Sequence, residues 1–212
     1  LQCMSKRNSG NVTLMPVVHG YSLQQLEKSC HQIIDVIGSP TLIGLGSLVP
    51  LLKGNYTRSK FGKTRYSHIQ FVEVAINVVR DVFPESFLHV FGVGGTTTMS
   101  ALYCLGADSV DSVSWRLKAA YGAIQLQGTS DRFLVERSWT RTRKTLSREE
   151  TRVLEKCQCP ICTEATNISG RIETLKKSFS NRAIHNSWTF LQEVEAFKLS
   201  LKDGNLLNFV LS

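Results

Sequence analysis

The chain has 212 residues, of which 42% are hydrophobic and 20% are charged, and 25 Lys and Arg against 17 Asp and Glu give a formal net charge of +8. This composition is that of an ordinary globular protein and excludes an intrinsically disordered chain. The positive charge favours a polyanionic partner such as a nucleic acid, although a basic protein without such a partner has the same charge balance.

The sequence has no stretch with the features of a signal peptide or a membrane span, because charged residues interrupt its longest apolar run at 69–83. Three of the six cysteines are isolated (Cys3, Cys30 and Cys104), and the other three lie together in "CQCPIC", residues 157–162. This distribution indicates a reducing compartment and a metal site rather than a disulfide framework. We therefore expect a cytoplasmic protein with no membrane partner.

Short apolar runs alternate with amphipathic segments through the first half of the chain. The runs are predicted strands, at 12–20, 41–52, 87–95 and 107–115, and the segments between them are predicted helices, at 22–38, 67–83 and 96–106. The helix at 22–38 begins with the capping box of Ser22 and Gln25 and ends at Gly38. Repeated strand–helix units with nearly continuous apolar strands predict a parallel sheet covered by helices.

The strand–helix alternation stops after residue 115. A basic run at 137–148 surrounds Trp139 and is followed by the cysteine cluster, a polar helix near 170–183 and a strong last helix at 187–204. We therefore predict two regions, with the boundary between residues 135 and 136.

The cysteine cluster has the spacing C-x-C-x2-C, and His185 follows it 22 residues later. Three thiolates and one imidazole suit a tetrahedral Zn²⁺ site, and a site with all four positions filled is structural rather than catalytic. His185 is the one histidine on the C-terminal side of the cluster, so we predict the ligands Cys157, Cys159, Cys162 and His185. The alternative is three reduced thiols without a metal, which the tight spacing disfavours.

Small or polar residues follow the predicted strands. They are His19 and Gly20, then Gly44, Gly46 and Ser47, then Gly92, Gly94 and Gly95. Any one glycine more often makes a turn, and "GVGG" lacks the order of a dinucleotide fingerprint. Ligands nevertheless bind at the carboxyl ends of strands in parallel α/β folds, so all these ends together favour a binding site.

Two kinds of charged residue complete the candidate sites. Asp108 and Asp111 lie on or beside the fourth predicted strand, where a carboxylate can act as a nucleophile or base, although each could also be a helix cap or a salt-bridge partner. The candidate phosphate contacts are Arg58, Lys60, Lys63, Arg116, Arg141 and Arg143. Trp139 among the arginines favours nucleic-acid binding slightly, whereas most charge runs are simply solvated.

Six stretches, in this order, resemble the tRNA-guanine transglycosylases, and most closely those of the archaeosine type. They are "PVVHG", "IGLGSLVPLL", "HVFGVGG", "LGADSVDSVSWR", "CQCPIC" and "HNSWTFLQEVEAFKLSLKDGNL", and the resemblance covers about residues 14–210. It implies a TIM barrel with a zinc subdomain and the exchange of a guanine in a nucleic acid for a 7-deazaguanine base.

The resemblance also implies roles for individual residues. Asp111 is similar to the nucleophile that forms a covalent glycosyl-enzyme, and Gly46 and Ser47 resemble the backbone of the base pocket, to which we add Gly92 and Gly94. His19 stands where the family usually has Gln, and an imidazole can still donate or accept a hydrogen bond there. Residues 114–132 resemble the branch that modifies DNA, so DNA is favoured over tRNA as the substrate.

Four βα units make only half of a (β/α)8 barrel, which usually needs about 250 residues. The resemblance assigns them to the C-terminal half, with the half barrel at 1–135 and the zinc-binding subdomain and last helix at 136–212. We expect this chain to be inactive alone and to need a missing N-terminal half or a homo-oligomer partner. The alternatives are a non-catalytic subunit and a zinc-stabilised module that only binds nucleic acid.

Overall fold

The computed structural model describes residues 13–49, 68–135 and 145–206. The described residues belong to two compact units, one within 1–93 and 102–111 and the other within 94–101 and 112–212. The functional boundary suggested at residue 135 stays a prediction. Among the helices within the described ranges, none is both long and apolar enough to cross a membrane.

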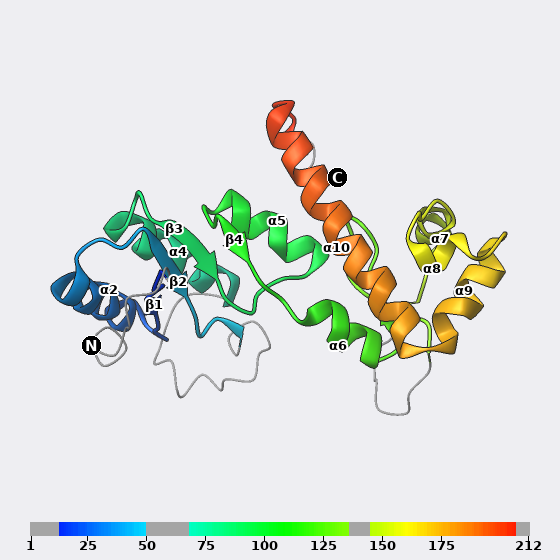
Figure 1. Ribbon diagram of the computed structural model, residues 1–212, viewed down its shortest axis with the longest axis horizontal. Helices are drawn as coiled ribbons and strands as arrows, with labels where there is room; N and C mark the ends of the chain where they lie inside the picture. Colours follow the sequence, from blue (N-terminus) through cyan, green and yellow to red (C-terminus); the bar gives the residue numbers. More distant parts are fainter. Residues whose placement is uncertain (1–12, 50–67, 136–144, 207–212) are drawn as a thin grey trace. The chain divides into compact units, whose positions relative to one another are not determined.

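The first unit contains a four-stranded parallel sheet in the order β1-β2-β3-β4, so the predicted parallel α/β arrangement is confirmed (Figure 1). The strands are shorter than predicted: β1 (Val17–Val18), β2 (Leu42–Leu45), β3 (Phe87–Val90) and β4 (Ser109–Val110). The intervening helices are α2 (Leu23–Ile37), α4 (His68–Val82) and α5 (Thr96–Cys104). Successive strands therefore lie side by side, as in consecutive βαβ units.

The register of the sheet separates an apolar face from a more polar one. One row across the strands carries apolar side chains: Val18, Leu45, Val90 and Val110. These residues pack in one core with buried residues of α2 and α4. The neighbouring row points to the opposite face, because side chains alternate along a strand. It consists of Val17, Gly44, His89 and Ser109, of which only Gly44 is fully buried.

The ends of α2 follow from local hydrogen bonding. The Ser22 hydroxyl accepts from the Gln25 N–H, and the Gly38 N–H donates to the Ile34 carbonyl with φ of 72° at Gly38. The predicted capping box forms only in part, because the Gln25 side chain accepts from the N–H of Tyr21 rather than of Ser22. The end of α2 at Gly38 is as predicted, because glycine adopts a positive φ without a steric clash.

Asp108 is a structural residue of this unit. Its Oδ2 atom accepts from the Leu88 N–H at 2.7 Å and pairs with Arg80. Arg80 also donates to the carbonyls of Ser86 and Gly106. The carboxylate therefore joins α4 to the start of β3 and the loop before β4, and it lies at the amino end of β4.

Replacing Asp108 by alanine is expected to lower the free energy of unfolding by about 1–3 kcal/mol, because the Leu88 N–H and the Arg80 guanidinium both lose an acceptor. Urea unfolding followed by circular dichroism measures this change. Asp35→Ala on the exposed face of α2 is the control. An Asp108→Ala midpoint equal to that of the control would show that the carboxylate does not support the fold.

The second unit is mainly helical. Its elements are α6 (Ser114–Ala120), the antiparallel pair β5 (Ala123–Ile124) and β6 (Arg132–Phe133), α7 (Arg148–Glu155), α8 (Pro160–Thr163), α9 (Ile168–Lys177) and α10 (Phe179–Lys202). The predicted strand at 107–115 was wrong at its end, because α6 begins at Ser114. Hydroxyl bonds turn the chain there: Ser112 and Ser114 both donate to the Gly94 carbonyl.

Helix α10 begins earlier than the expected start at residue 187. The Ser178 hydroxyl accepts from the Asn181 N–H and starts the helix at Phe179. Buried polar side chains then attach α10 to its neighbours: Arg182 donates to the Ala119 and Leu175 carbonyls, and Asn186 accepts from the Gln125 N–H. These bonds satisfy polar groups that would otherwise be costly to bury.

Glu193 on α10 is a buried carboxyl, 3% exposed, that accepts from the Gly128 N–H at 3.0 Å. Burial raises the pKa of Glu193, and the Gly128 N–H offsets this only in part. Because the folded-state pKa is the higher one, the protonated carboxyl of Glu193 favours the folded state. Its contribution to the free energy of unfolding is complete below the unfolded-state pKa and is lost as pH rises through the folded-state pKa.

Glu193→Gln is therefore expected to raise stability at neutral pH and to flatten its pH dependence. Urea midpoints from about pH 5 to about pH 8 test this, with exposed Glu195→Gln on the same helix as the control. A lower midpoint for Glu193→Gln at the upper end of this range would contradict it.

Candidate metal centre and carboxyl edge of the sheet

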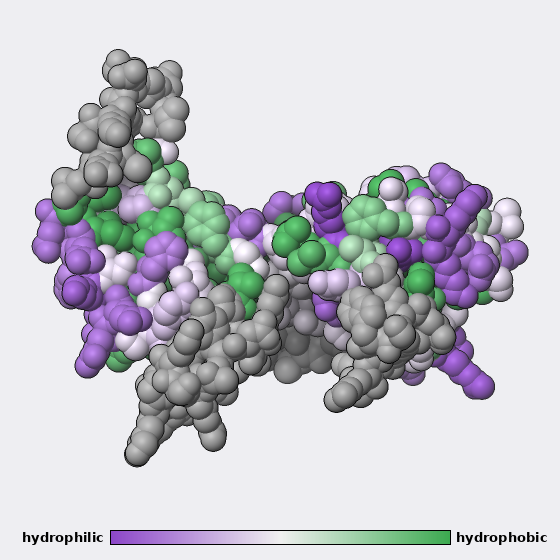
Figure 2. Space-filling view, turned by 90° about the horizontal axis from the view of Figure 1, so that it is seen from below, coloured by the Kyte–Doolittle hydropathy of each residue, from purple (hydrophilic) through white to green (hydrophobic). Residues whose placement is uncertain are grey.

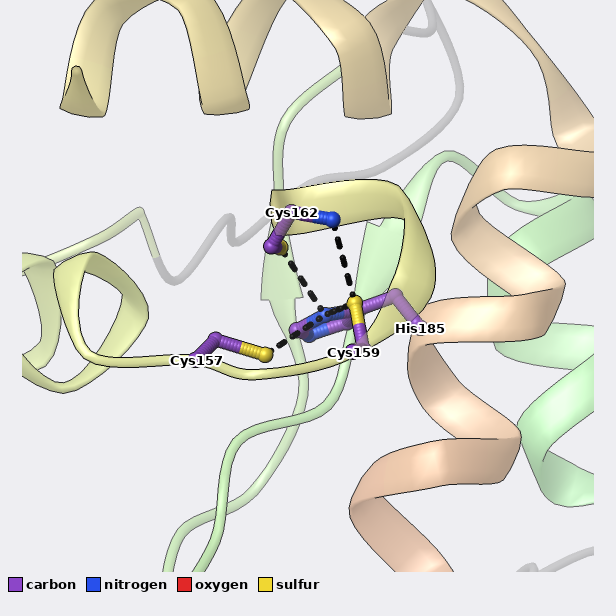
Figure 3. A group of neighbouring side chains, drawn as sticks. All are labelled: Cys157, Cys159, Cys162 and His185. Carbon is purple, nitrogen blue, oxygen red and sulfur yellow. Dashed lines mark hydrogen bonds between the residues drawn. The ribbon is translucent and has the colours of Figure 1, made fainter. Parts of the chain in front are cut away.

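Cys157, Cys159, Cys162 and His185 come together in the second unit (Figure 3). Their ligand atoms all lie within 4.8 Å of one another. The three sulfurs lie 3.6, 3.5 and 3.5 Å from His185 Nδ1, in sequence order. Helix α7 ends just before Cys157, the short α8 carries Cys162 and is capped by Cys159, and α10 supplies His185. The predicted ligand set is thus confirmed as a compact potential metal site.

The histidine presents the correct nitrogen to the sulfurs. Its Nε2 atom lies 3.0 Å from the Gln125 carbonyl, which can only accept, so Nε2 carries the proton. The lone pair of Nδ1 is then directed at the three sulfurs. Such a bond to the second ring nitrogen is the usual way in which a protein orients a metal-binding imidazole.

The three thiols lie close enough together to shift one another's pKa values. Hydrogen bonds from Cys159 and Cys162 lower the pKa of Cys157 to about 3, and nearby Arg171 acts in the same direction. The pKa of Cys162 is raised, because its thiol hydrogen bonds to Cys157 and because it is buried. Metal binding releases the remaining thiol protons, and Zn²⁺ suits a donor set of three sulfurs and one imidazole. With four protein ligands the site is structural.

Cys162→Ser is expected to abolish stoichiometric zinc binding, because a buried sulfur ligand is lost, and to unfold the surrounding helices. Metal analysis of the purified chain and circular dichroism before and after chelation measure both effects. Cys104→Ser, at an exposed cysteine outside the cluster, should bind zinc like the wild type. A helix content that chelation leaves unchanged would contradict the structural role.

Asp111 follows β4 directly and lies at the carboxyl end of the sheet. Its side chain is 57% exposed. Its Oδ1 atom accepts from the Gly92 N–H at 2.6 Å and lies 3.4 Å from His89 Nε2. Gly92 has φ of 71° where the chain leaves β3, so glycine suits this position. The predicted nucleophile is therefore accessible at the edge where ligands bind in parallel α/β folds.

The carboxyl ends of β1 and β2 carry three more predicted site residues. His19 Nδ1 lies 2.9 Å from Ser47 Oγ. A Cβ on Gly46 would lie 2.6 Å from His19 Cε1, so a side chain there would displace the imidazole. Ser47 has φ of 67°, a left-handed conformation that is uncommon outside glycine and typical of functional loops. The role of these residues in base binding stays a prediction.

The remaining predicted residues belong to the second unit or fall outside the described residues. Gly94 belongs to the second unit, where its carbonyl accepts from Ser112 and Ser114. Arg116 is exposed on α6. The other predicted phosphate contacts, Arg58, Lys60, Lys63, Arg141 and Arg143, fall outside the described residues.

Two residues beside Asp111, namely His89 and Ser109, are absent from the sequence-based site. The signal that could have found them is strand alternation, because both occupy the row that faces away from α2 and α4. Polar residues in that row of a parallel strand are unusual, since such strands are usually apolar throughout.

A parallel α/β sheet with an accessible carboxylate at its carboxyl edge, in one chain with a Cys3His centre, defines a zinc-binding α/β protein. The family model described as queuine tRNA-ribosyltransferase matches residues 2–212, and the chain belongs to this family of transferases.

The chain is similar to archaeal proteins named tRNA-guanine(15) transglycosylase. That of Methanococcus aeolicus is 28% identical over 168 residues, which cover 78% of this chain and 22% of the relative. That of Pyrococcus abyssi is 25% identical over 166 residues, covering 78% and 24%. That of Methanosarcina acetivorans is 26% identical over 211 residues, covering 99% and 37%. The chain thus spans between about a fifth and two fifths of the length of these relatives.

Proposed function

We propose that the chain supplies the nucleophile-bearing half of a guanine transglycosylase barrel together with its zinc subdomain. The observation that carries this proposal is the position of Asp111. Its carboxylate is exposed at the carboxyl end of β4, and the Gly92 N–H orients it. Family membership supports a transferase, and the resemblance around residue 111 supports this carboxylate as its nucleophile.

The chemistry is a double displacement with retention at the sugar. An Asp111 oxygen bonds to C1′ of the nucleotide, and the C1′–N9 bond breaks with its electron pair moving to guanine, which takes a proton from solvent. The incoming 7-deazaguanine loses its N9 proton to solvent and bonds to C1′ as the C1′–oxygen bond breaks. The electron pair of that bond restores the Asp111 carboxylate.

The target guanine must leave its stack to reach Asp111, which costs roughly a few kcal/mol. Phosphate contacts of the basic residues would offset this cost, and the net charge of +8 supports such contacts. The names of the relatives support tRNA as the polynucleotide, whereas the stretch at 114–132 supports DNA. Both tRNA and DNA are therefore tested as substrates in the adduct assay described below.

The active enzyme would need further strands. Within the described residues, β1 pairs only with β2 and β4 only with β3, so the sheet has two open edges. Figure 2 shows hydrophobic side chains gathered on the surface of the part that holds this sheet. Open strand edges and apolar surface both favour association with further polypeptide. We propose that four more strands, from another segment or a partner, complete the barrel.

A complemented enzyme, made from this chain and the N-terminal barrel half of an archaeal relative, is expected to form a covalent adduct with guanine-containing tRNA or DNA. The adduct is visible on a denaturing gel, because the link to Asp111 survives denaturation. Asp111→Asn should form none, since the amide is a far weaker nucleophile. Asp81→Asn, on the exposed face of α4, is the matched control and should form the wild-type amount.

Exchange of radiolabelled guanine by the chain alone would support the chemistry and contradict the need for further strands. If the complemented wild-type protein binds nucleic acid but forms no adduct, the proposed transferase activity is contradicted. That result would favour the alternative of a non-catalytic, zinc-stabilised binding module.

A further inference from the structure

His89 lies between Ser109 and Asp111, in the row of the sheet that faces away from α2 and α4. Its Nδ1 atom is 2.8 Å from Ser109 Oγ, and its Nε2 atom is 3.4 Å from Asp111 Oδ1. The side chain is only 18% exposed, although it belongs to a row that the main core does not cover. The three residues thus form a chain of polar contacts that ends at the exposed carboxylate.

The ring of His89 is held in place by its neighbours. The ring of Phe91 packs edge-on against it, with 4.4 Å between centroids and an interplanar angle of 76°. Gly44 pairs with His89 in the register and leaves room for Phe91, because a Cβ at Gly44 would lie 2.7 Å from Phe91 Cε2. The absence of a side chain on β2 therefore helps to fix the imidazole on β3.

The polar contacts select one tautomer. If Ser109 donates its hydroxyl hydrogen to Nδ1, the ring proton is on Nε2 and is directed at the Asp111 carboxylate. The opposite tautomer would direct a lone pair at the carboxylate, which is electrostatically unfavourable. The separation of 3.4 Å is longer than a typical N–H···O bond, as is common for catalytic contacts in the absence of substrate.

Two donors converge on the same carboxylate oxygen. The Gly92 N–H and His89 Nε2 both approach Oδ1 of Asp111. Among the contacts of the described residues, none involves Oδ2 of Asp111. The carboxylate is therefore held by one oxygen, and the other is left to attack.

We propose that His89 is a positioning residue for Asp111 and that Ser109 fixes its tautomer, an inference that rests on the proposed function. In the first displacement, His89 and Gly92 hold Oδ1 so that Oδ2 faces C1′, which raises the fraction of productive encounters. In the second displacement, the electron pair of the C1′–Oδ2 bond returns to the carboxylate. The two donors stabilise the negative charge that then develops on Oδ1.

The test uses the complemented enzyme and three variants at the site. His89→Leu removes the Nε2–H donor, and His89→Gln keeps an amide N–H at a similar reach. Ser109→Ala removes the hydroxyl that fixes the tautomer of His89. His89→Leu is expected to slow single-turnover adduct formation about 10- to 100-fold, whereas the dissociation constant for nucleic acid changes less than about twofold. His89→Gln should recover most of the rate, and Ser109→Ala should give an intermediate one.

Phe87→Leu, two residues earlier on the same strand and 47% exposed, is the matched control and should keep the wild-type rate. Urea midpoints of all variants report any structural effect separately. A merely structural histidine would make His89→Gln and His89→Leu equally slow, or slow neither, and either result overturns the proposal for His89 alone. A wild-type enzyme that forms no adduct overturns the proposed function as well.

A second measurement needs only this chain. Long-range ¹H–¹⁵N spectra should show His89 protonated at Nε2, and Ser109→Ala should populate the other tautomer. A wild-type His89 protonated at Nδ1 would overturn the proposal whatever the outcome of the adduct assay.

Discussion

The arrangement of the candidate site depends on the two-residue alternation of four parallel strands in register. Val18, Leu45 and Val90 fall on the side that packs against α2 and α4, so the hydrophobic effect fixes which way each strand faces. A shift of one residue would move every side chain to the other face. Once the apolar row is buried, Gly44, His89 and Ser109 must lie on the other side.

The contacts of Asp108 with Leu88 and Arg80 add a second constraint to this arrangement. Asp108 and Asp111 lie three residues apart, yet one is at the amino end of β4 and the other is just beyond its carboxyl end. Asp108 accepts from the Leu88 N–H and pairs with Arg80 at the amino end of β4, which is not the edge where ligands bind in parallel α/β folds. Asp111 retains an exposed carboxylate with a single strong backbone contact. Identical side chains thus differ in role because of what the neighbouring strand offers each of them.

The metal centre organises the second unit in a different way. Its ligands come from the cysteine segment at 157–162 and from α10, and the hydrogen bond from His185 Nε2 to the Gln125 carbonyl joins α10 to the residue after β5. Arg182 donates to the Ala119 carbonyl of α6, and Asn186 on the same helix donates to the Ala123 carbonyl of β5. These buried polar groups are costly to desolvate, so they stabilise the unit only when all partners are in place. A bound Zn²⁺ would balance the charge of the thiolates that ligate it.

The sequence alone predicted the parallel α/β class and the zinc ligands, and its resemblance to the transglycosylases singled out Asp111 as the candidate carboxylate. Apolar periodicity and the spacing of Cys157, Cys159 and Cys162 are local patterns, and local patterns can be read without a structure. Only the tertiary structure decided which residues contact one another and where α6 begins. It showed that Asp108 is bound by Arg80, that α6 begins at Ser114, and that His89 approaches Asp111. Strand pairing sets the contact of His89 with Asp111, because β3 and β4 bring together residues about 20 positions apart along the chain, and no local pattern specifies which residues will meet.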